Sequence, residues 1–125
     1  MPLNPSHIVQ IAIEVQDLER AKRFYGETLG LPHLFDAPPG LSFFQCGATR
    51  LMLSRPEGAD VAGSSILYYH VPDARAAAAA LTADGVTLVE EAHRVGRAGD
   101  KDVWLAVAPD GEGNLFGLMS EEAAG

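Results

Sequence analysis

The strongest constraint on the fold is an internal repeat, because the pattern of residues 7–31 recurs at residues 65–88. In each copy an alternating segment leads to a Val-x-Asp tripeptide, a helical pattern follows, and a glycine ends it. Asp17 and Asp73 hold the same place in the two copies. A repeat of this length in a chain of 125 residues predicts two similar supersecondary units in tandem.

The first copy predicts a strand followed by an amphipathic helix. In residues 8–15 the side chains of Ile11, Ile13 and Val15 alternate with more polar ones, and a period of two is typical of a strand with one apolar face. Asp17 can accept hydrogen bonds from the first helical turn, and Gly30 permits a left-handed helix end.

Three further strands are predicted in each copy. In the first they are HLFD, LSFFQC and RLMLS; in the second they lie at about residues 86–91, 102–108 and 114–119. Residues 92–100 are predicted to form a long loop, Gly113-Asn114 a turn with positive φ angles, and residues 121–125 a loose tail. The fold class is therefore α+β, with two βαβββ modules in one domain. Its predicted parts are module one at 7–55, a linker at 56–63 and module two at 64–120.

Composition excludes several kinds of partner. The chain has 17 acidic and 9 basic residues, a formal net charge of -8 and no cluster of Lys or Arg. Nucleic acid and anionic membrane surfaces are therefore poor candidates. The single cysteine, Cys46, cannot form an intrachain disulfide, and no signal peptide or spanning apolar run is present. These features predict a cytoplasmic protein.

Three motifs carry a family resemblance: VQDLERAKRFYGETLGL, VPDARAAAAALTADGV and GNLFGLMS. With these motifs at repeat spacing, the chain resembles the vicinal oxygen chelate superfamily, which includes glyoxalase I, bleomycin-resistance proteins and extradiol dioxygenases. The resemblance implies paired βαβββ modules whose sheets curl into an open barrel around a cavity, usually in a homodimer. Whether each cavity lies within one chain or across the dimer is left open.

The resemblance also implies four cavity-facing positions that supply metal ligands in metal-dependent members. In this sequence they fall on Gln10, a residue near Leu53, Ile66 and Gly117. Of these, only Gln10 has a side-chain donor, and a divalent ion needs three or four protein ligands. We therefore expect no metal or other cofactor at the usual site. A displaced metal site is a remaining alternative, with candidate ligands His70, Glu14, Tyr68 and His93.

The predicted ligand cavity combines apolar walls with a few polar groups. Its expected lining residues are Gln10, Ala12, Phe44, Ile66, Tyr68, His93, Trp104 and Gly117. Phe43 is an alternative to Phe44, and aromatic residues such as these phenylalanines and Trp104 are more often core residues because they bury the largest apolar area. The amide of Gln10 could equally be satisfied by neighbouring strands or by water.

Candidate catalytic groups are Glu14 as a general base, Tyr68 as a directed hydrogen-bond donor, and His93. His93 lies beside Arg94 and Arg97, a combination that suits an anionic ligand, although the acidic chain offers structural partners for both arginines.

Two functional hypotheses follow. The first is a small-molecule binding protein of the bleomycin-resistance type without metal. The alternative is a lyase, isomerase or dioxygenase that uses a displaced metal or metal-free acid and base catalysis. A structural dimer with no pocket is a third possibility, and no sequence feature identifies the ligand.

Overall fold

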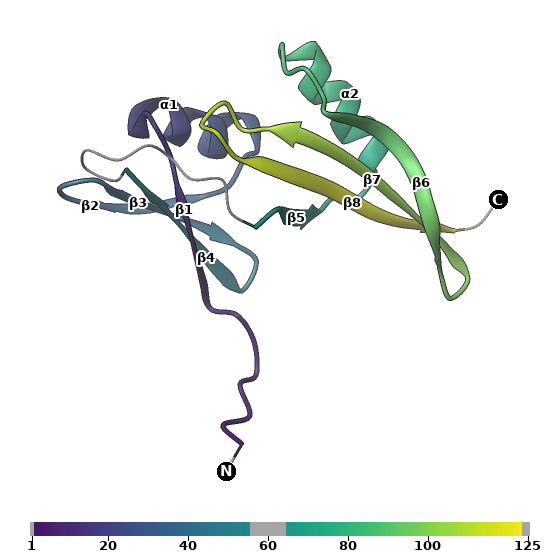
Figure 1. Cartoon of the computed structure of the whole chain (residues 1–125), viewed down its shortest axis with the longest axis horizontal. Coiled ribbons are helices and arrows are strands. Elements are labelled where there is room, and N and C mark those ends of the chain that lie inside the picture. Colours follow the sequence, from purple (N-terminus) through teal and green to yellow (C-terminus); the bar gives the residue numbers. More distant parts are fainter. Residues whose placement is uncertain (1, 56–64, 124–125) are drawn as a thin grey trace. The chain divides into compact units, whose positions relative to one another are not determined.

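The computed structural model describes residues 2–55 and 65–123, which belong to two compact units, Met1–Val61 and Ala62–Gly125. The predicted linker at residues 56–63 lies outside the described residues. Both units have the order β-α-β-β-β, which confirms the predicted α+β class and the tandem plan. Figure 1 shows a helix beside an open sheet in each unit.

The first unit contains a four-stranded mixed sheet. Its elements are β1 (Gln10–Glu14), α1 (Leu18–Arg23), the π-helix η1 (Phe24–Thr28), β2 (His33–Ala37), β3 (Leu41–Cys46) and β4 (Thr49–Ser54). The strand order is β1-β4-β3-β2, with β1 parallel to β4 and the other neighbours antiparallel. The first strand of the unit therefore pairs with the last.

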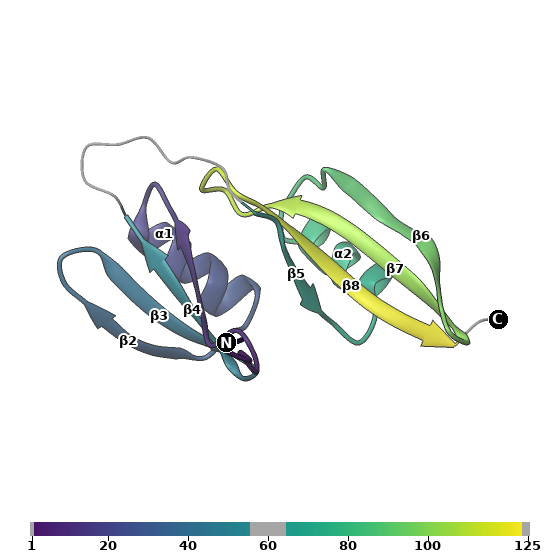
Figure 2. The ribbon, with the colours of Figure 1, turned by 60° about the horizontal axis from the view of Figure 1, so that its bottom comes forward.

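The second unit repeats this topology. Its elements are β5 (Leu67–His70), α2 (Ala74–Ala83), β6 (Glu90–Ala98), β7 (Lys101–Pro109) and β8 (Leu115–Ala123). The order is β5-β8-β7-β6, and β5 is parallel to β8. Figure 2 shows α2 behind the face of this sheet.

The two repeated aspartates are helix caps, as predicted. Asp17 and Asp73 both have extended backbones, with φ of -129° and -150° and the same ψ of 107°. Asp17 accepts from the amide of Arg20 at 3.0 Å, a bond that lowers the pKa of the Asp17 carboxyl. Asp73 accepts from two amides of the first turn of α2. The chain then leaves each helix through a glycine of positive φ, Gly30 or Gly85.

Each helix covers one face of its own sheet, and the core of each unit lies between them. The predicted inward residues Ile13 and Val15 are buried, while Gln10, Ala12 and Glu14 are exposed on the other side. The core residues of the first unit include Ile13, Val15, Ala21, Tyr25, Phe44, Leu51 and Leu53. Those of the second include Ala74, Ala78, Leu81, Ala106, Ala108, Phe116 and Leu118. Hereafter, the face of each sheet opposite its own helix is called the outer face.

The predicted loop at residues 92–100 is wrong. These residues form most of β6 and the start of a hairpin, in which Gly99 at a φ of 65° turns the chain directly into β7. Because β6 is an edge strand with mostly exposed side chains, it lacks the apolar alternation by which a strand is recognised. The predicted loose tail is also partly wrong, since residues 121–123 pair with β7.

The turn before β8 differs in detail from the prediction. Gly111 and Gly113 have the positive φ angles, whereas Asn114 does not. The Asn114 side chain instead donates to Asp110, whose other carboxylate oxygen accepts from two backbone amides. No helix among the described residues is long and apolar enough to cross a membrane.

Candidate functional site

The register of β1, β4 and β3 determines which side chains share the outer face of the first unit. Gln10 lies opposite Arg50, Ala12 opposite Met52, and Glu14 opposite Ser54. On the next strand these rows continue through Gln45, Phe43 and Leu41. Polar groups therefore lie at both ends of the face, and an apolar row lies between them.

Gln10 is not an isolated amide, because it holds the side chain of Arg50. The Arg50 Nε donates to the Gln10 Oε1 at 2.7 Å, and the Gln10 Nε2 lies 4.0 Å from the Met52 sulfur. The Arg50 guanidinium also lies over the Phe43 ring, with its Cζ 5.5 Å from the ring centroid. Phe43 in turn stacks on Phe35 at a centroid distance of 4.4 Å. An arginine is thus fixed by an amide and by an aromatic face.

Sequence reasoning missed Arg50. Its partner Gln10 is 40 residues away in the chain, and a parallel pairing at that separation leaves no local sequence signal. The repeat could have suggested that β1 pairs with β4, but only the structure shows which residues of the two strands are paired.

Two expected positions in this unit are wrong by one residue. Phe44 is buried to 1% exposure on the helix side, where it contacts Gly26, so it does not share the outer face with Gln10 and Ala12. Leu53 is likewise fully buried under the helix. The residue of β4 that shares the outer face with Ala12 is Met52.

In the second unit, Tyr68 and Gly117 share the outer face. They are paired across β5 and β8, and the Tyr68 ring lies directly over Gly117. A Cβ added to Gly117 would lie 2.6 Å from the Tyr68 Cε1, which is closer than real Cβ contacts. Tyr68 itself is 51% exposed, and Ile66 before the strand is 40% exposed. His70, paired with Met119, is exposed farther along the same strand.

The predicted cluster of His93, Arg94 and Arg97 is divided between the two faces of the sheet. His93 pairs with Leu105 on the outer face, and its Nδ1 lies 2.8 Å from the carbonyl oxygen of Glu91. Arg94 and Arg97 are on the other face, where both guanidiniums lie near the Asp102 carboxylate, at 2.8 Å and 3.6 Å. The arginines therefore have a structural partner, and the three side chains do not form one anion site.

Trp104 is also on the helix side of its sheet, which corrects the expected cavity wall. The guanidinium of Arg75 from α2 lies over its indole at 4.1 Å, and Arg75 forms an ion pair with Glu122 at 2.7 Å. Trp104 therefore belongs to the helix–sheet contact and not to the face of Tyr68 and Gly117.

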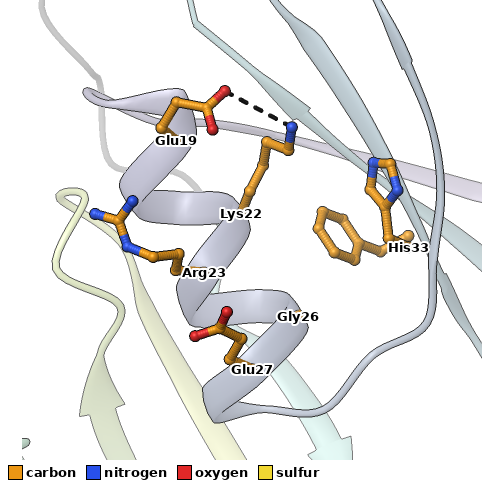
Figure 3. Close-up of a pocket in the computed structure, with 7 residues that line it drawn as sticks. Glu19, Lys22, Arg23, Gly26, Glu27 and His33 are labelled. Carbon is orange, nitrogen blue, oxygen red and sulfur yellow. Dashed lines mark ion pairs between the residues drawn. The ribbon is translucent and has the colours of Figure 1, made fainter.

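A hollow of about 250 Å³ lies on the helix side of the first unit (Figure 3). Its lining residues are Glu19, Lys22, Arg23, Gly26, Glu27, His33 and Phe44. Two of the lining residues, Lys22 and His33, are bound to Asp36 beside the hollow. Asp36 accepts from Lys22 at 2.7 Å and from Ser42 at 2.7 Å, and lies 2.8 Å from the His33 Nε2.

These hydrogen bonds, first that of Lys22, then those of Ser42 and His33, hold the pKa of Asp36 well below its usual range. The network connects α1 to β2 and β3, and both carboxylate oxygens of Asp36 already have hydrogen-bond partners within the unit. We therefore interpret it as a structural feature. Cys46 is half-buried at the end of β3, and burial raises the pKa of its thiol, which does not favour a nucleophile.

The residues at the four family ligand positions do not suit a divalent metal ion of the kind that the resemblance allows. In the first unit the two positions hold Gln10, which is bound to Arg50, and Met52, whose thioether suits soft metals only. In the second they hold Ile66 and Gly117, which have no side-chain donor. Among the residues that the structure describes, no group of three His, Cys, Asp or Glu side chains could hold a metal ion elsewhere.

Comparison with known proteins identifies the family of this chain. A sequence model of the Glyoxalase/Bleomycin resistance protein/Dioxygenase superfamily matches residues 7–118. The chain belongs to this superfamily. No curated protein matches it.

Solved structures of the superfamily have the same fold. A lactoylglutathione lyase from Agrobacterium tumefaciens is 24% identical, with a TM-score of 0.73 over 93% of this chain and 94% of that one. A superfamily member from Sphaerobacter thermophilus is 25% identical, with a TM-score of 0.75 and coverages of 95% and 100%. A glyoxalase-related enzyme from Fulvimarina pelagi is 21% identical, with a TM-score of 0.72 and coverages of 93% and 88%. At these identities the likeness supports the fold and not a particular reaction.

Proposed function

We propose that this superfamily member is a small-molecule binding protein that works without a metal at the usual family position. The observation that carries the proposal is the pair Tyr68 and Gly117. The Tyr68 ring occupies the space into which a metal-binding side chain at residue 117 would project. In the first unit the equivalent residue, Met52, is a poor ligand for hard divalent ions.

The composition of the outer faces supports a role in binding organic molecules. The first unit offers an apolar row, Ala12, Met52 and Phe43, next to the polar pair Gln10 and Arg50. The second unit offers the Tyr68 ring and hydroxyl beside the apolar strand residues of β7 and β8. Apolar surfaces with a few directed polar groups are typical of small-molecule sites. We further propose that the protein is a cytoplasmic homodimer.

Two measurements test this proposal together. The first is elemental analysis of protein purified without chelator and again after soaking in zinc, nickel, manganese and ferrous iron; we expect far less than one metal per chain. The second is a thermal-shift screen of aromatic and carboxylate ligands, in which binders should raise the melting temperature. Light scattering coupled to size exclusion tests the homodimer.

The contrary result has a defined form. One tightly bound metal per chain, lost in Gln10→Ala, would refute the proposal and favour a lyase, isomerase or dioxygenase. In that event Glu14, Tyr68 and His93 would be the residues to substitute first, with glyoxalase and dioxygenase assays as the readout.

A further inference from the structure

We propose that Arg50 binds the carboxylate of an organic anion on the outer face of the first unit. This inference rests on the proposed function and specifies the ligand class. It concerns a residue that the family resemblance did not suggest, and it depends on how the Arg50 side chain is held.

The hydrogen bond with Gln10 fixes the Arg50 guanidinium through its Nε–H and does not use the two terminal amino groups. The Gln10 oxygen takes the Arg50 Nε–H, at 2.7 Å, so the two terminal amino groups are the ones that remain for a ligand. Two parallel N–H groups match the two oxygens of a carboxylate. Because the Gln10 amide holds the guanidinium and the Phe43 ring lies 5.5 Å from its Cζ, less side-chain entropy remains to be lost when an anion binds.

Arg50 also differs from other cations of its unit in its surroundings. Lys22 forms an ion pair with Asp36 at 2.7 Å, and the Arg55 Nε donates to a backbone carbonyl. Among the described residues, Arg50 has no carboxylate within ion-pair distance, and its strand neighbours in register are the neutral amides Gln10 and Gln45. What distinguishes Arg50 within the described part of the chain is that its guanidinium is held by a neutral amide and lies over an aromatic ring, with no carboxylate neutralising its charge.

The surface next to Arg50 defines the rest of the ligand. The row adjacent to it along the strands consists of Ala12, Met52 and Phe43. Phe43 is only 7% exposed and stacks on Phe35, which is 46% exposed. Small, flexible and aromatic apolar groups in one row suit a planar hydrocarbon body. The geometry therefore fits an aromatic carboxylate, with its charge at Arg50 and its ring over Ala12, Met52 and the exposed Phe35.

The test compares 2-naphthoate with 2-naphthamide, its neutral analogue, by NMR titration of the full ¹⁵N-labelled chain. We expect 2-naphthoate to bind about tenfold or more tightly than the amide, since charge-assisted hydrogen bonds are about twice as strong as neutral ones. Its binding should shift the Arg50 Nε–H signal. Arg50→Gln should abolish the preference, and Arg50→Lys should restore only part of it because an ammonium lacks the fork.

Arg55→Gln is the matched control, because it removes the same charge from the same unit. It should leave the preference for 2-naphthoate unchanged, whereas Gln10→Glu should weaken it by giving Arg50 an internal carboxylate. Unchanged amide dispersion would show that the variants fold.

Each other outcome contradicts the inference in a distinguishable way. Equal binding of the two probes, or a preference that survives Arg50→Gln, would overturn the role of Arg50 while leaving a small-molecule binding protein. No binding of 2-naphthoate would overturn the ligand class, and the thermal-shift screen would then show independently whether the proposed function stands.

Discussion

Replacing Gly117 with alanine should destabilise the protein, although the backbone at this position suits alanine. Gly117 does not have a positive φ, so the substitution introduces no backbone strain. Its new Cβ would collide with the Tyr68 ring, which must move. Overpacking costs about 1–3 kcal/mol in closed cores, and because Tyr68 is 51% exposed and can rotate away, we expect about 1 kcal/mol here.

In a Tyr68→Ala background the same substitution should have the opposite sign. Without the ring nothing occupies the space over Gly117, and glycine within a strand is less favourable than alanine by about 0.5–1 kcal/mol. The coupling free energy between the two positions should therefore be about 1.5–2 kcal/mol. Urea denaturation of the four proteins, followed by circular dichroism, measures it.

Gly96 on β6 provides the control, because an added Cβ there meets no atom within 4 Å. Gly96→Ala should have the same small effect whether residue 68 is tyrosine or alanine. If Gly117→Ala changed the free energy of unfolding equally in the two backgrounds, the Tyr68 ring would not occupy the space over Gly117. The main support for a metal-free site would then be lost.

Three further predictions concern the two helices, one for an N-terminal cap and two for contacts with the sheets. Asp36→Asn should lower the free energy of unfolding by about 1 kcal/mol at neutral pH, since it removes the ion pair with Lys22. Because the pKa of Asp36 is lowered in the folded state, the contribution of its carboxylate to stability should be present above about pH 4 and lost as the pH falls further. In urea titrations the stability of the variant should therefore fall less steeply with acid than that of the unsubstituted protein. Asp73→Ala should cost about 1 kcal/mol by removing the cap of α2, and Asp73→Asn should restore most of it in thermal melts. Arg75→Ala should shift the emission of Trp104 to longer wavelength and cost about 0.5–1 kcal/mol, whereas unchanged emission would contradict the stacking.

Local patterns in the sequence were sufficient where local interactions decide the structure. The alternation before Asp17, the caps at Asp17 and Asp73, and the glycine helix ends at Gly30 and Gly85 depend on residues a few positions apart. Their repetition then predicted the tandem order, because two identical sets of start and stop signals require two similar units.

The sequence was insufficient where burial did not produce a periodic signal. In the strand LSFFQC two large apolar residues, Phe43 and Phe44, are adjacent, so alternation cannot decide which of them faces the helix. The edge strand β6 is polar on both sides and therefore looked like a loop. The pairing of Gln10 with Arg50 depends on a long-range register that no local window contains.

The corrected register shows which residue lies opposite each ligand position on the last strand of a unit, Met52 in the first and Gly117 in the second. Ala12 and Tyr68 precede the two capping aspartates by the same distance, and their partners across the parallel strands are Met52 and Gly117. In the first unit the small Ala12 lies opposite the large Met52. In the second unit the large Tyr68 lies opposite Gly117, which has no side chain. Because the Tyr68 ring lies over Gly117, a larger side chain at residue 117 must displace this ring, which is 51% exposed and can rotate away. A metal ligand introduced at Gly117 would therefore have to displace the Tyr68 ring, whereas one introduced at Met52 would lie opposite the small side chain of Ala12.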